Sequence, residues 1–80
     1  MENWKFHDIG FDGQIMKING KNIWGYSWEP IKQEPFKAPH PAHKDQIHTF
    51  RIYRINFDGG NVIFAAAEVS NMVWCFYVQV

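Results

Sequence analysis

The sequence predicts an all-β domain, a small bent antiparallel sheet or barrel of about six strands. Short runs rich in Ile, Val, Phe, Tyr and Trp follow one another along the 80 residues, as strands require. Turn-forming pairs separate these runs, and Asp12-Gly13 and Asn19-Gly20 are typical of two-residue hairpin turns. No segment has the apolar spacing of an amphipathic helix, so little or no helix is expected.

Two three-strand meanders are expected, one on each side of a proline-rich segment. Asp58-Gly59-Gly60 is a third turn signal, compatible with a bulged hairpin, and Ser70-Asn71 is a fourth. The expected strands are 3–11, 14–18, 21–28, 46–57, 61–69 and 72–80.

Residues 29–45 join the two meanders and are expected to form a loop that also contains histidines. All four prolines lie here, and proline lacks the N–H donor that the interior of a sheet needs. A loop of this length in a compact domain is typically functional or mobile. A short helical turn over 31–34 would have to end at Pro35.

The C-terminal half is nearly uncharged and predicts strands that are covered on both faces. From Gly59 to Val80 the only charged residue is Glu68. Apolar runs without alternation indicate strands that are buried on both sides. Without helices, closure into a barrel or a partner subunit would supply the second cover. The apolar residues of strand 46–57 change face, so we expect it to bend at a bulge and serve both halves.

Composition and charge restrict the classes of function. The chain suffices for one domain over 1–80, and its 46% hydrophobic content excludes intrinsic disorder. Eight basic and eight acidic residues give no net charge, which argues against nucleic acid as a partner. A single cysteine, Cys75, and the lack of a signal-peptide pattern predict a cytoplasmic protein. The apolar stretch 62–80 is not expected to span a membrane, because Glu68 lies near its centre.

Three histidines form an H-x2-H-x4-H series and are the candidate metal site. The imidazoles of His40, His43 and His48 could bind zinc and leave a position for an activated water. The first two lie on the proline-punctuated segment, where no helix places them on one face and no cysteine joins them. Exposed loop histidines are the favoured interpretation, and no cofactor is expected.

Trp24, Tyr26 and Trp28 alternate along one expected strand, so their side chains would share a face. Three interpretations stay open. The row could stack on sugars or unpaired bases, contact a protein partner, or form the core. The core is favoured, because the opposite face carries only isoleucine, glycine and serine.

The remaining candidates give no catalytic constellation. Arg51 and Arg54 lie among aromatic residues, as in single-strand binding surfaces, but they fall on opposite faces of a strand. Cys75 has apolar neighbours, so burial would raise its pKa and leave it unreactive. There is no nucleophile elbow, phosphate-binding glycine loop or diagnostic pair of carboxylates. We therefore expect a protein without enzymatic activity.

The sequence thus predicts a small interaction protein of the adapter, inhibitor or immunity type, acting through contacts with a protein partner or a second copy. Its apolar C-terminal half would supply the interface, and its last strand could lie at an open sheet edge. The expected interface residues are Ala66, Glu68, Trp74, Phe76 and Val78. A ligand-binding module based on the aromatic row and a metal-binding protein or enzyme based on the histidines are the alternatives.

Overall fold

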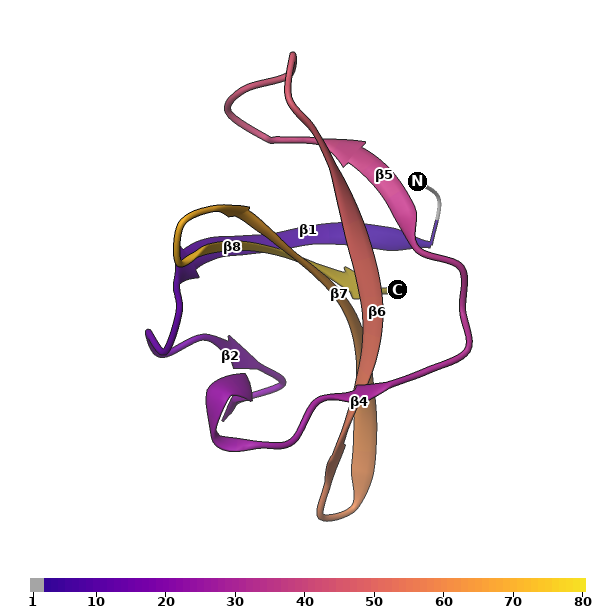
Figure 1. The fold of residues 1–80 in the computed structure, drawn as a ribbon. Coiled ribbons are helices and arrows are strands. Elements are labelled where there is room, and N and C mark those ends of the chain that lie inside the picture. The colour runs from indigo at the N-terminus through magenta and orange to yellow at the C-terminus, as the bar shows by residue number, and fades with distance from the viewer. Residues whose placement is uncertain (1–2) are drawn as a thin grey trace.

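A six-stranded antiparallel sheet forms the body of the molecule in the computed structural model, which describes residues 3–80 (Figure 1). The elements are β1 Trp4–Phe11, β2 Lys17–Ile18, β3 Lys21–Asn22, the 3-10 turn η1 Ile23–Gly25, β4 Glu29–Pro30, β5 Phe36–Pro39, β6 Ile47–Phe57, β7 Gly60–Ser70 and β8 Val73–Gln79. The strands follow in the order β1-β8-β7-β6-β4, and β5 pairs with the other end of β6. β2 and β3 form a separate small sheet. The prediction of an all-β domain is confirmed.

The long strands β6, β7 and β8 form the meander that the sequence predicts in the C-terminal half. Gly59, with φ of +85°, supplies the left-handed residue of the β6–β7 turn. Four consecutive residues of β7, from Phe64 to Ala67, are buried at 0–6% exposure. Because neighbours on a strand point to opposite faces, both faces of this meander are covered, as predicted.

β1 does not pair with the strand that follows it in the sequence. It pairs with β8, in a register that joins Trp4 to Gln79 and Phe11 to Val73 and contains a bulge at His7. The prediction of a three-strand meander in the N-terminal half is therefore wrong. The prediction of an open edge at the last strand is also wrong, because β8 lies between β1 and β7. The apolar pattern of a strand fixes its buried face but not its neighbour.

Residues 14–28 cover one face of the sheet and contribute no strand to it (Figure 1). Asn19 and Gly20 both have positive φ, as the Asn-Gly signal predicts, and make the short β2–β3 hairpin. η1 interrupts the strand predicted at 21–28, and the Asn22 side chain accepts the N–H of Trp24 there. The chain thus supplies the second cover itself. The first core consists of Met16, Ile18, Ile23, Ile55, Phe64, Ala66 and Phe76.

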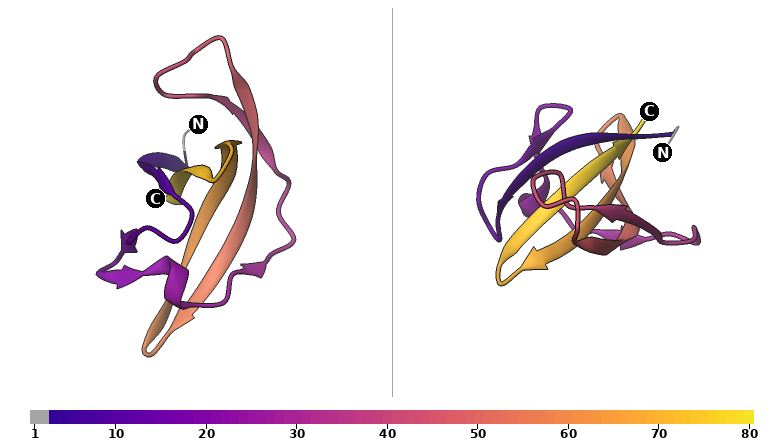
Figure 2. Two further views of the ribbon diagram at one scale, coloured as in Figure 1. Left: turned by 60° about the vertical axis from the view of Figure 1, so that its left-hand side comes forward. Right: turned by 90° about the horizontal axis from the view of Figure 1, so that it is seen from above.

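On the other face the sheet curls and encloses a second core. β1 and β5, at opposite edges, approach each other through side chains but do not pair, so the sheet is bent and is not a closed barrel (Figure 2). The buried members of this core are Ala38, Phe50, Ile52, Ala65, Ala67, Cys75 and Tyr77.

The proline-rich segment forms one edge of the sheet, where the sequence predicts only a loop. β4 and β5 pair with successive parts of β6 and contain Pro30 and Pro39, which an edge strand tolerates because one side needs no donor. Residues 31–35 contain no helical turn and arch away between them. Residues 40–46 form the loop that remains, at the tip of the β5–β6 hairpin (Figure 1). No helix in residues 3–80 has the length and apolarity needed to cross a bilayer.

Candidate interaction surfaces

Two of the three residues predicted to form an aromatic row lie against the first core. Trp24 and Trp28 are partly buried, their ring centroids are 4.9 Å apart, and the Trp28 indole N–H donates to Ile23 O at 2.9 Å. Tyr26 is 39% exposed and meets the ring of Phe57 edge-on, with centroids 4.8 Å apart. Since η1 turns the chain here, the three rings form no flat exposed row.

The residues predicted to form an interface lie on β7 and β8 and differ in exposure. Ala66 and Phe76 are buried in the core that residues 14–28 cover, and Trp74 and Val78 pack against it partly buried. Contact with a partner through the first two would require the covering segment to move. Glu68 lies outside the core, is exposed, and accepts a backbone N–H from the β7–β8 turn.

The three histidines of the spaced series lie together at the tip of the β5–β6 hairpin. The ring centroid of His40 is 4.8 Å from that of His43 and 6.0 Å from that of His48. The Nδ1 atom of His40 accepts the Ala42 N–H at 3.0 Å, so the neutral ring carries its proton on Nε2. Desolvation, and then the two neighbouring histidines, lowers the pKa of His40 below 6.5. Within residues 3–80, no three histidine, cysteine or acidic side chains are arranged to hold a metal ion.

The thiol of Cys75 is free and fully buried in the second core. Burial raises its pKa to about 11. A thiol with this pKa is almost entirely protonated near neutral pH, and the nucleophilic form is the thiolate. Cys75 therefore packs as a small apolar side chain.

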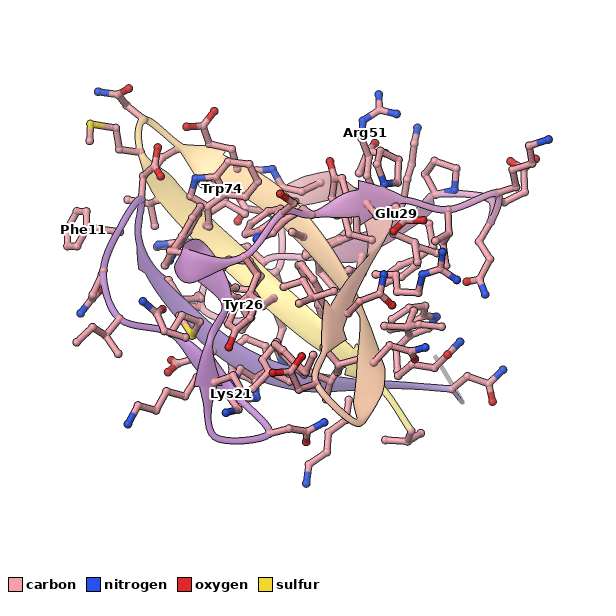
Figure 3. The ribbon with its side chains drawn as sticks, turned by 90° about the horizontal axis from the view of Figure 1, so that it is seen from below. Phe11, Lys21, Tyr26, Glu29, Arg51 and Trp74 are labelled. Carbon is pink, nitrogen blue, oxygen red and sulfur yellow. The ribbon has the colours of Figure 1, made fainter. Side chains whose placement is uncertain are left out.

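Three exposed apolar side chains that sequence analysis did not single out lie on adjacent turns. Phe11, Ile15 and Met72 are 63%, 71% and 51% exposed, and we call them the turn patch. One backbone hydrogen bond ties the two turns together, since Asp12 N–H donates to Met72 O at 2.6 Å. Within the first turn, Gln14 N–H donates to Phe11 O at 2.9 Å. Figure 3 shows Phe11 projecting at the side of the molecule.

Met72 has a backbone conformation that its side chain disfavours. Its φ is +62°, in the left-handed region, which costs an L-residue roughly 1–2 kcal/mol. Half of the side chain is exposed, so burial offsets little of this cost. Two acids border the patch: Asp12 is exposed, and the Glu68 carboxylate accepts the Met72 N–H at 3.1 Å.

A cleft of about 270 Å³ lies where residues 31–35 arch away from β6. β4 pairs with β6 as far as Tyr53, and β5 pairs with β6 again from Phe50. Only Arg51 and Ile52 of β6 therefore lie opposite the five residues of the arch. We call it the arch cleft. Its walls are Pro30, Ile31, Gln33, Pro35, Arg51, Ile52 and Tyr53.

The walls of the arch cleft are of mixed polarity, and one of the polar groups carries a charge. Arg51 is exposed at its wall. The only ion pair of residues 3–80 joins Arg54 to Glu29, so no carboxylate of these residues pairs with the guanidinium of Arg51. The cleft thus combines some apolar surface with one arginine that has no ion pair within residues 3–80.

No family model matches the chain, and no curated protein or solved structure is significantly similar to it.

Proposed function

We propose that this protein is a small, non-catalytic interaction protein that binds a protein partner through the turn patch. The observation that carries the proposal is Met72, an exposed methionine with left-handed backbone. Glycine or asparagine would adopt this conformation at lower cost, so the stability of the fold gives no reason for methionine here. Backbone strain of this kind is concentrated at functional sites, and methionine is frequent on adaptable binding surfaces.

The neighbours of Met72 support the same function. A single exposed apolar side chain is ordinary on a protein surface. Here Phe11 and Ile15 are more exposed than Met72 itself and lie on a turn that is hydrogen-bonded to its own. We infer that these three large apolar groups, at two connected turns, form one contact surface.

The test compares capture of proteins from an extract of the source cells. The baits are the wild type, a Phe11→Ser/Ile15→Ser double variant, and a control variant, Ile47→Ser. Ile47 is 58% exposed at the start of β6, so the control also removes an exposed apolar side chain, but outside the turn patch. Thermal unfolding of all three baits verifies that they are folded.

A protein retained by the wild type and by Ile47→Ser, but lost from the double variant, supports the proposal. If the double variant retains every protein that the wild type retains, the turn patch is not the binding surface and the proposal is wrong.

A further inference from the structure

We propose that the turn patch of one molecule inserts into the arch cleft of a second copy, so that the chain self-associates head to tail. This inference rests on the proposed function, because it names the partner of the same surface. The volume of the arch cleft, about 270 Å³, is at the lower end of the range of roughly 300–1,000 Å³ typical of small-molecule sites. It suits a single large side chain, and Phe11 is the largest side chain of the turn patch.

The two surfaces are complementary in polarity. Pro30, Ile31 and Pro35 give the arch cleft apolar surface against which an aromatic ring can pack. Phe11 would leave water on entering it, since it is 63% exposed in the single molecule.

The two surfaces are also complementary in charge. Asp12 follows Phe11 directly, is exposed, and has no ion pair among residues 3–80. A Phe-Asp pair at the cleft would bring a carboxylate next to the guanidinium of Arg51, and arginine binds carboxylates through two parallel hydrogen bonds. The ring would supply apolar contact and the carboxylate would fix its orientation.

The arrangement of the two surfaces makes the contact head to tail. Figure 3 shows Phe11 and Arg51 well apart on the molecule, so one copy cannot fill its own cleft. Each added copy leaves one turn patch and one arch cleft free, as heterologous contacts do. The absence of net charge means that copies do not repel one another at long range. A contact this small should be weak, with a Kd of roughly 0.1–1 mM.

Two variants each remove one half of the contact. Phe11→Ser/Asp12→Asn lacks the ring and the carboxylate that would enter the cleft but keeps the cleft itself. Arg51→Glu keeps the turn patch and reverses the charge of the cleft. All three altered residues are exposed, so both variants are expected to fold, which NMR spectra would verify. Lys32→Glu is the matched control, because it reverses an exposed charge on the same arch outside the cleft walls.

Sedimentation equilibrium measures the association. The average mass of the wild type and of Lys32→Glu should rise with concentration, with Kd values that agree within about twofold. Each of the two half-contact variants should stay monomeric alone, with its Kd raised at least about tenfold. Their equimolar mixture should form a one-to-one dimer, because the intact patch of one meets the intact cleft of the other.

A wild type that stays monomeric up to about 1 mM, or a mixture no heavier than its separate components, would overturn the inference. The proposed function would survive that result if the monomer still captured a different protein through the turn patch. The proposed function would itself be wrong if the Phe11→Ser/Ile15→Ser double variant still captured every protein that the wild type captures and still self-associated.

Discussion

The rings of Trp4 and Phe36 pack against each other across the open side of the sheet, with centroids 5.2 Å apart. Trp4 lies on the edge strand β1 and Phe36 on β5 at the opposite edge, and these strands are not paired. Side chains therefore close the second core at the place where a barrel would use backbone hydrogen bonds.

Phe36→Ala is expected to lower the free energy of unfolding by about 2–4 kcal/mol. The ring also stacks on Phe50 at 5.5 Å and meets Tyr77 at 6.0 Å, so its removal opens the second core. Urea unfolding measures the change. A double-mutant cycle with Trp4→Ala should give a coupling energy of about 0.5–1.5 kcal/mol. A coupling near zero would show that the two edges are held independently.

Trp28→Phe is expected to lower the free energy of unfolding by about 1–2 kcal/mol. The substitution removes the hydrogen bond to Ile23 O and reduces contacts with aromatic rings whose centroids lie 4.9–5.9 Å from that of Trp28. Urea unfolding measures the loss, and Tyr26→Phe, on an exposed side chain, should change stability by less than about 0.5 kcal/mol. If Trp28→Phe were equally harmless, the ring would not support the core, and stacking on a ligand would become the better explanation.

Local signals predict the turns and the C-terminal strands but not the partners of the strands. The strands expected at 46–57, 61–69 and 72–80 agree with the structure within one residue at each end, because apolar runs and turn pairs specify them locally. The pairing of β1 with β8 depends on backbone groups about 70 residues apart in the chain, and the apolar residues of β1 suit any neighbour. The pairing of the proline-rich segment with β6 is also not predicted by local signals, because proline excludes only the interior of a sheet and not its edge.

Local sequence signals also do not predict the candidate surfaces, because these depend on strand pairing. The three histidines come together because β5 pairs Ala38 with His48, which the spacing of the series does not reveal. The register of β7 and β8 shifts between Glu68 and Ser70, and the left-handed residue of the turn is Met72, one position after the predicted Ser70-Asn71 pair. The exposure of Phe11 and the arch cleft depend likewise on pairing between distant segments.

Met72→Gly is expected to raise the free energy of unfolding by about 0.5 kcal/mol. Relief of the left-handed strain gains roughly 1–2 kcal/mol, and the greater freedom of glycine in the unfolded chain removes about 0.5–1 kcal/mol of it. Met72→Ala retains the strain, so it serves as the control and should give no gain. Urea unfolding measures all three proteins. A loss of more than about 1 kcal/mol in Met72→Gly would show that the methionine supports the fold, which would remove the main argument for a binding residue.

Acidification is expected to destabilise the protein through His40. Desolvation, together with His43 and His48, lowers the pKa of this imidazole in the folded chain. The unfolded chain therefore binds a proton at His40 at a higher pH than the folded chain does. Its contribution to stability is fully present above the unfolded pKa of about 6.5 and is lost as the pH falls below that value. The geometry agrees, because a proton on Nδ1 would abolish the hydrogen bond from Ala42 N–H.

His40→Asn isolates this effect, because asparagine can accept the N–H two residues ahead but does not titrate. Urea unfolding of both proteins at about pH 7.5 and about pH 5.5 removes by subtraction the contribution of titrating groups that do not interact with His40. The wild type should lose more stability than His40→Asn between the two pH values. Equal losses would mean that protonation of His40 is not coupled to folding, and the tip of the β5–β6 hairpin would then not respond to acid through this residue.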